Sequence, residues 1–313
     1  MSTLSTPTVL SHIGAIITIL IWGVTFIASK ILLETFTMIE ILLIRFVIAW
    51  IILSFIDMYR KKNNKVKVPL SLKEEGTFFL SGLTGVTLYY ALETFALTKT
   101  SASNVGILVS LAPISTAILA LIWLKSEKFK IKYLYGFAVA FVGVVLVITN
   151  GAEFAGFSIE GDLLAILGTF AWAMYALLLK RIDTKKYHII TYTKKIMMYG
   201  IITLLPIALQ QKVSISITDF SLLHTLLLLF LSVGASALCF ILWNYAVDNL
   251  GVYKTSAYIY ASPLVTLIAA YVVLKEPITM YAMIGAASII LGLYISEHKS
   301  IPKMKPIKNS SLR

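Results

Sequence analysis

Ten long runs of apolar residues alternate with short polar segments along the chain. A helix needs roughly 17–25 apolar residues to span the hydrocarbon core of a bilayer, and each run comes close to that length. We therefore expect ten transmembrane helices. The runs cover residues 13–33, 39–59, 77–97, 102–124, 133–149, 163–179, 190–209, 222–247, 256–274 and 280–295.

The runs are apolar on every side rather than on alternate positions, which favours lipid-embedded helices over the strands of a membrane barrel. The composition agrees, because 58% of the residues are hydrophobic and only 13% are charged. A soluble domain carries about 25% charged residues, so this chain lacks a polar shell. The expected fold class is an all-α integral membrane protein.

The net charge of +12 is concentrated in loops on one side of the expected membrane. On that side, lysines and arginines occur within residues 60–73, 125–132, 180–186, 254 and 299–313. The other side holds only Lys30, Lys99, Lys212 and Lys275. By the positive-inside rule this bias predicts a multi-pass protein of the cell (inner or plasma) membrane with both termini in the cytoplasm. The first 14 residues contain no Lys or Arg, so we expect a retained helix rather than a cleaved signal peptide.

The two halves of the chain match at a constant shift of 150 residues. The equivalent pairs are Trp22/Trp172, Lys30/Lys180, Arg45/Lys195, Pro113/Pro263, Thr116/Thr266 and Lys125/Lys275. A shift of 149 then pairs Gly136 with Gly285 and Gly143 with Gly292. Such a series indicates an internal repeat. We expect repeats at residues 1–150 and 151–298, followed by a basic cytoplasmic tail at residues 299–313.

Each repeat would contain five helices. Two fused units with an odd number of helices must lie upside-down relative to each other, which is the inverted-repeat architecture of many transporters. The symmetry gives two conformations of similar energy, one open to each side, around a site near the midplane.

A proline-centred helix ending in a Lys-Ser-Glu or Lys-Glu sequence, followed by a helix with two glycines seven apart, occurs in both halves. These features lie in residues 101–127 with Gly136 and Gly143, and in residues 255–276 with Gly285 and Gly292. Together with Trp22, Trp172 and Arg45, they resemble the drug/metabolite transporter superfamily and, more narrowly, its EamA type. The resemblance covers residues 13–296. It implies ten helices, a central cavity and transport of amino acids or related metabolites, often as export.

Glu93 lies inside the third apolar run. A charged side chain at the bilayer centre costs on the order of 3 kcal/mol on insertion scales. Two interpretations stay open: a cavity carboxyl group that binds a proton or a substrate cation, or a group paired with a basic neighbour near the interface. The repeat-equivalent position holds Trp243, so the two halves differ here, as a site for an asymmetric substrate would require.

Arg45 lies within the second run and Lys195 at the equivalent place of the second half. They either attract a substrate carboxylate or phosphate, or snorkel toward the headgroups. We favour substrate binding for Arg45 and snorkelling for Lys195. Aromatic and polar side chains on neighbouring helices complete the candidate binding site, with packing, an interface belt or helix–helix hydrogen bonds as the alternative. They are Trp22, Tyr90, Asn104, Ser110, Trp172, Tyr175, Trp243, Asn244, Tyr258, Tyr260 and Ser262.

Pro113 and Pro263 each remove a backbone hydrogen bond in the middle of a run. We expect a kink that shapes the packing and takes part in gating. The paired glycines permit close helix approach, either inside one chain or in a homodimer, so the protein is expected to be a monomer or a homodimer.

Several function classes are excluded by what the chain lacks. Its single cysteine, Cys239, excludes an internal disulfide and a cysteine-based metal site. There is no His-Glu-x-x-His zinc motif and no phosphate-binding loop, so we expect no metal and no cofactor. The positive charge is explained as loop charge that sets topology, so we expect no nucleic acid partner. A secondary transporter, using the substrate gradient or protons, is the leading hypothesis. A membrane-embedded enzyme and a non-transporting sensor or assembly protein are the alternatives.

Overall fold

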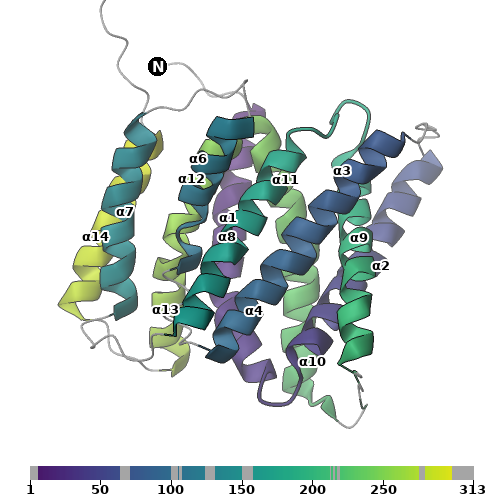
Figure 1. Cartoon of the computed structure of the whole chain (residues 1–313), viewed down its shortest axis with the longest axis horizontal. Coiled ribbons are helices and arrows are strands. Elements are labelled where there is room, and N and C mark those ends of the chain that lie inside the picture. The colour runs from purple at the N-terminus through teal and green to yellow at the C-terminus, as the bar shows by residue number, and fades with distance from the viewer. Residues whose placement is uncertain are drawn as a thin grey trace, which may run out of the picture.

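The computed structural model describes residues 6–63, 71–99, 105, 108–123, 131–149, 158–211, 213, 216, 219–274 and 279–297. Within these residues the protein contains no strand and forms ten helical rods (Figure 1). Four rods lie in residues 6–123: α1 (Thr6–Leu32), α2 (Met38–Asn63), the continuous α3–η1–α4 (Leu72–Gly82, Leu83–Leu88, Tyr89–Lys99) and α6 (Ala112–Trp123). Three more are α7 (Ile131–Thr149), α8 (Ile159–Leu179) and α9 (Ile189–Gln210). The last three are α10–η3–α11 (Leu222–Leu229, Phe230–Leu238, Cys239–Leu250), α12–η4–α13 (Val252–Ala257, Tyr258–Ala261, Ser262–Leu274) and α14 (Met280–Glu297).

Each apolar run overlaps one rod within the described residues, which confirms the expected all-helical fold. By length and apolar composition alone, four described helices suffice to cross a membrane. They are Thr6–Ser29, Met38–Lys62, Ile159–Leu179 and Leu222–Leu250. The outer surface is apolar, with side chains such as Phe55, Leu209 and Leu226 more than half exposed. Charged and polar groups such as Arg45 and Asn244 are buried instead. This distribution suits a hydrocarbon solvent.

Helices of residues 6–149 pack mainly against helices of residues 158–297. α1 packs on α11 and α13, and the equivalent helix α8 packs on α4 and α6. α2 pairs with α9 near the right-hand edge of Figure 1, and α7 pairs with α14 at the left-hand edge. The packing is therefore reciprocal. Where α1 packs on α11 and α13, its equivalent α8 packs on α4 and α6, which are the equivalents of α11 and α13.

The glycine pairs lie in the contact between α7 and α14. A Cβ atom added to Gly143 would stand 2.5 Å from the Gly285 carbonyl oxygen, and one added to Gly292 would collide with the Gly136 backbone. Only glycine allows the two helix backbones to come so close. Of the two uses that the sequence left open for these glycines, the structure shows the contact inside one chain.

Two rods contain a π-helical segment, and the two segments occupy equivalent places. Residues 83–88 of η1 correspond at the shift of 150 to residues 233–238, which lie within η3. A π-helix replaces the usual i→i+4 hydrogen bonds with i→i+5 bonds and often marks a functional place. η1 packs closely on α9, where the Thr87 hydroxyl donates to the Gly200 carbonyl oxygen at 2.9 Å.

The two prolines stand just after a break in their rods. Pro113 is the second residue of α6, which follows a turn at residues 110–111, and Pro263 is the second residue of α13, which follows the 3-10 segment η4. The sequence predicted a mid-helix kink. The chain instead ends one helix and starts another, because proline fits the first helical turn, where its missing N–H is not needed.

Candidate functional site

Three tryptophans from different rods meet at the centre of the molecule. Trp22 from α1 lies 5.2 Å from Trp172 of α8 and 5.1 Å from Trp243 of α11 between ring centres. Trp172 and Trp243 are 5.8 Å apart, and Phe240 packs against Trp22 and Trp172. These separations are typical of favourable aromatic pairs. We call Trp22, Trp172, Trp243, Tyr175 and Phe240 the central aromatic cluster.

The indole N–H groups of this cluster are not equally satisfied. The Trp22 Nε1 group donates to the Ala235 carbonyl oxygen, within the π-helical segment η3, at 3.0 Å. The Nε1 atoms of Trp172 and Trp243 are buried and have no hydrogen-bond partner among the described residues. Because an unpaired buried donor is costly, these two N–H groups are unusual features of the cluster.

Tyr175 and Asn244 take part in a buried hydrogen-bond chain at the edge of the cluster. The Tyr175 hydroxyl donates to the Asn244 Oδ1 atom at 2.5 Å, and the Asn244 amide donates to the Thr193 hydroxyl at 2.9 Å. The chain joins α8, α11 and α9. These two residues therefore fix the cluster in place from within the second half.

Arg45 points from α2 into the interior and is only 4% exposed. Its Nε group donates to the Ser236 hydroxyl of η3 at 3.0 Å, and its guanidinium carbon lies 4.7 Å from the centre of the Tyr90 ring. Among the described residues no carboxylate lies within ion-pairing distance of it. A buried guanidinium without a counter-ion is available to an anionic ligand group.

Glu93 lies on α4, one turn beyond Tyr90. Its Oε2 atom is buried and has no hydrogen-bond partner among the described residues, while Tyr89 interacts with the same carboxyl group. Arg45 attracts Glu93 across a distance too long for an ion pair. The two groups of opposite charge therefore face a shared space without neutralising each other.

That space is a small pocket between α1, α2 and α4. It is lined among others by Thr25, Ser29, Arg45, Tyr90, Glu93 and Thr94. Its cavity volume is about 30 Å³, which holds one or two water molecules. Sites for small organic ligands usually measure about 300–1,000 Å³. In this conformation the pocket is too small for an organic ligand, although charged and hydroxyl side chains line it.

The other residues that the sequence suggested lie away from this pocket. Tyr258 hydrogen-bonds with His12 at 2.6 Å, and Tyr260 packs against Phe137 in a separate apolar cluster. Ser110 is buried directly before α6, and Ser262 begins α13 where its carbonyl oxygen accepts from the Thr266 hydroxyl. Asn104 lies outside the described residues.

Sequence reasoning did not find Ser236, Thr25, Ser29 or Thr94. Serine and threonine are common in transmembrane helices, where they bond to their own backbone, so their presence alone carries no signal. Ser236 lies in the π-helical segment η3, where its hydroxyl accepts a hydrogen bond from Arg45. Only the run of small residues around it could have drawn attention to this place.

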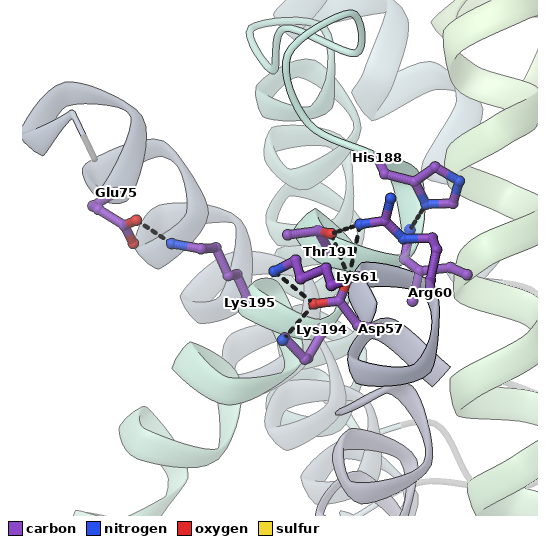
Figure 2. A network of polar contacts seen from close by, with 9 residues as sticks. Asp57, Arg60, Lys61, Glu75, His188, Thr191, Lys194 and Lys195 are labelled. Atoms are coloured by element: carbon purple, nitrogen blue, oxygen red, sulfur yellow. Dashed lines mark hydrogen bonds and ion pairs between the residues drawn. The ribbon is translucent and has the colours of Figure 1, made fainter. Parts of the chain in front are cut away.

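A cluster of charged and polar side chains lies away from the pocket, where α2 ends and α9 begins (Figure 2). The Asp57 carboxylate, 1% exposed, accepts from the Lys194 ammonium at 2.7 Å and from the Thr191 hydroxyl at 2.6 Å. Arg60 and Lys61 of the same helix approach it at 3.0 Å each. Asp57 thus ties the end of α2 to the start of α9.

Two further ion pairs join α3 to the same region. Glu75 pairs with Lys195 and accepts from the Tyr199 hydroxyl at 2.8 Å. Glu74 pairs with Lys186 at 2.5 Å and accepts from the Tyr187 hydroxyl at 2.8 Å. The hydrogen bond from Lys186 lowers the pKa of the Glu74 carboxyl and raises that of Lys186 itself. Lys195, expected to snorkel, instead forms an ion pair.

The fold and the site are those of a helical multi-pass membrane protein with a small polar pocket and a buried aromatic cluster. The chain belongs to the EamA-like transporter family, whose pattern matches it twice, over residues 9–149 and 159–297. This confirms the resemblance drawn from the sequence. The family places the chain among transporters in the membrane rather than among enzymes.

Two curated relatives are also named as transporters. An uncharacterized transporter of Archaeoglobus fulgidus is 31% identical over 92% of this chain and 98% of its own length. The uncharacterized transporter YyaM of Bacillus subtilis is 32% identical over 77% of this chain and 79% of its own length. One crystal structure of a protein superposes with a TM-score of 0.76 at 17% identity, over 93% of this chain and 98% of that one, which supports the fold alone.

Proposed function

We propose that this protein is a secondary transporter that moves a small metabolite across the inner membrane by alternating access. The observation that carries the proposal is the pairing of Arg45 and Glu93 in one pocket. Both side chains project inward next to the central aromatic cluster, their charges are opposite, and they do not form an ion pair. Intramembrane ionisable residues of this kind mark substrate or ion pathways.

The alternating motion would come from two inverted five-helix repeats, at residues 1–150 and 151–298. Support comes from the reciprocal packing of α1 on α11 and of α8 on α4, from the two π-helical segments at equivalent places, and from the double family match. Rocking one repeat against the other would expose the centre to each side in turn. Such a cycle passes through an intermediate in which the site is closed to both sides, and the small volume of the pocket fits that intermediate.

The proposed substrate is an amino acid or a related compound. The Arg45 guanidinium suits a carboxylate, and the Glu93 carboxyl suits an ammonium group or a proton. The aromatic cluster would pack on the apolar part of the substrate. Glu93 would couple transport to protons if its proton and the substrate compete for the same oxygen atoms.

We propose export as the direction of transport, because the resemblance to EamA-type transporters implies it. With both termini and the basic segments in the cytoplasm, the pocket would lie nearer the outer face, since it is lined by the end of α1 and the start of α2. Reporter proteins fused to the two termini test the orientation, and a periplasmic C-terminus would contradict it.

The decisive experiment is flux in vesicles that contain the purified protein. Vesicles loaded with a mixture of labelled amino acids and amines are followed for efflux with and without a pH gradient. We expect Glu93→Gln to lose the response to the gradient and to slow flux roughly tenfold or more, since a charge-assisted hydrogen bond is worth about 1.5–3 kcal/mol. Glu34→Gln is the matched control, because Glu34 is an exposed carboxylate.

Two results would count against the proposal. A parent protein that moves none of the compounds in either direction, while folded in the vesicles, would favour a sensor or assembly role. An unchanged pH profile in Glu93→Gln, with flux equal to that of the parent, would show that Glu93 has a structural role and couples nothing.

A further inference from the structure

We propose that the ion pairs between α3, α2 and α9 form a latch that holds one end of the transporter closed, and that the two ends are held by chemically unlike contacts. The latch consists of Asp57 with Lys194, Glu75 with Lys195, and Glu74 with Lys186. The inference rests on the proposed alternating access. It adds that ionic strength sets the balance between the two conformations.

All three pairs of the latch join the first half of the chain to the second. Asp57, Glu74 and Glu75 come from α2 and α3, whereas the three lysines come from α9 and the segment before it. Figure 2 shows two of these ion pairs. Lys195 contacts Glu75 and Lys194 contacts Asp57, from neighbouring positions of α9. Separating the halves at this end would break all three pairs together.

The latch is more than a set of exposed surface pairs. The side chain of Asp57 is 1% exposed, and the side chains of the other pairs are 19–28% exposed. Each carboxylate also accepts a hydrogen bond from a hydroxyl group of the second half, namely Thr191, Tyr187 or Tyr199. Networks with buried members hold geometry better than isolated surface pairs do.

The repeat-equivalent contacts lie at the opposite end of the bundle and carry no such charge pairs. At the shift of 150, Glu74 and Lys186 correspond to His224 and Phe36, whose rings lie 5.5 Å apart in an edge-on contact. Phe36 also packs on Phe220 at 5.2 Å. The same pair of positions is therefore ionic at one end and aromatic at the other.

The remaining two equivalents agree with this contrast. Asp57 and Lys194 correspond to Ile207 and Ile44, while Glu75 corresponds to Thr225. The equivalent of Lys195 is Arg45, which turns inward to Ser236 instead of bridging to a carboxylate.

Among the described residues, the opposite end has one ion pair between the halves. Lys99 at the end of α4 lies 3.3 Å from Glu160 at the start of α8, with exposures of 39% and 62%. An exposed pair of this kind is worth little in free energy, because solvent and salt screen it. It therefore provides a matched control for the latch.

Unlike contacts respond differently to salt. The Debye length falls from about 10 Å at 0.1 M to about 3 Å at 1 M salt, so added salt weakens the partly exposed pairs of Glu74 and Glu75, and the buried Asp57 pair less. Aromatic contacts do not weaken in this way. High ionic strength should therefore shift the population toward the conformation that is open at the latch end, without any substrate.

Access of a water-soluble thiol reagent to a buried position of α3 close to the latch measures this shift. The native Cys239 is replaced by alanine, and Ser81→Cys is introduced as the reporter. Ser81 is fully buried on α3, about 9 Å along the helix from Glu75. The labelling rate in vesicles then reports opening at this end, and the measurement needs no knowledge of the substrate.

We expect Glu75→Gln and Lys195→Gln to raise the labelling rate roughly threefold or more, and 1 M KCl to raise it in the parent but less in these variants. The charge swap, Glu75→Lys with Lys195→Glu, should restore the rate toward that of the parent. Lys99→Gln should leave the rate unchanged, because the pair that it removes lies at the other end.

The outcomes separate the latch from the proposed function. If labelling is the same in parent and variants and does not respond to salt, the latch is wrong even where flux is normal. If labelling follows charge and salt as expected but the parent moves no solute, the latch stands and transport is rejected. Should a single substitution unfold the protein, the salt series on the parent and the charge swap still decide the question.

Discussion

Replacing Arg45 by lysine keeps a positive charge at the pocket and removes the planar guanidinium group. In the protein the Nε atom donates to Ser236 at 3.0 Å, and the guanidinium carbon lies 4.7 Å from the Tyr90 ring. A lysine ammonium is a single point charge that cannot make the Ser236 hydrogen bond, stack on Tyr90 and present two parallel donors to a carboxylate. We therefore expect Arg45→Lys to weaken substrate binding.

The size of the loss follows from these contacts. A hydrogen bond between a charged donor and its acceptor contributes about 1.5–3 kcal/mol, and stacking of the cation on an aromatic ring about 0.5–2 kcal/mol. The ammonium group regains part of the Coulomb attraction to the substrate. A net loss near one charged hydrogen bond corresponds to roughly 10- to 150-fold weaker binding.

The assay is the dissociation constant of the best substrate, from ligand-induced thermal stabilisation or equilibrium binding in detergent. Ser236→Ala should weaken binding by a smaller factor, since it only frees the arginine from its fixed orientation. The double variant should bind no more weakly than Arg45→Lys alone, because both changes act through one contact. Equal affinity in parent and Arg45→Lys would refute contact between Arg45 and the substrate, and strictly additive effects would refute positioning by Ser236.

Two further predictions concern stability. Gly143→Ala should lower the free energy of unfolding by about 1–3 kcal/mol, because the new methyl group would stand 2.5 Å from the Gly285 carbonyl oxygen; Gly76→Ala, with no atom within 4 Å, is the control, and equal melting temperatures would contradict the packing argument. The lowered pKa of Glu74 means that its ion pair with Lys186 stabilises the fold above the ordinary carboxyl value of 4.5 and that this stabilisation is lost as the pH falls below it. The parent should therefore unfold more steeply with acid than Glu74→Gln, and identical acid profiles would contradict a stabilising pair.

The helices could be predicted from the sequence because lipid imposes a simple requirement. Every backbone polar group must be satisfied within its own helix, so each crossing is written as one long apolar run. The tryptophan pair was accessible for a related reason, since an internal repeat places Trp22 and Trp172 at equivalent positions. Their contact at 5.2 Å is what two equivalent helices near the centre should give.

The finer features depend on local geometry that hydropathy does not encode. Nothing in the apolar run 222–247 predicts that η3 winds as a π-helix and presents Ser236 to Arg45. The prolines also behaved differently from expectation, because Pro113 and Pro263 start helices instead of bending them. Such changes in backbone winding depend on contacts between helices that are far apart in the sequence.

Charged residues at helix ends were the least predictable. Lys195 was expected to snorkel toward the headgroups, as a lysine near a membrane surface commonly does. Its actual partner, Glu75, lies 120 residues away in sequence on a different helix. Asp57 was not singled out at all, because a carboxylate close to Arg60 and Lys61 looks like an ordinary contact along one helix. Only the assembled bundle brings Lys194 against it.

The interlocked packing of the two halves has a consequence for how the protein holds together. α1 and α8 each bury their sides against helices of the opposite half, so neither half encloses a core of its own. The two halves therefore resemble obligate subunits carried on one polypeptide chain. Cutting the chain between α7 and α8 should leave two fragments that associate when they are made together. Either fragment alone would expose the helix faces that its partner normally covers.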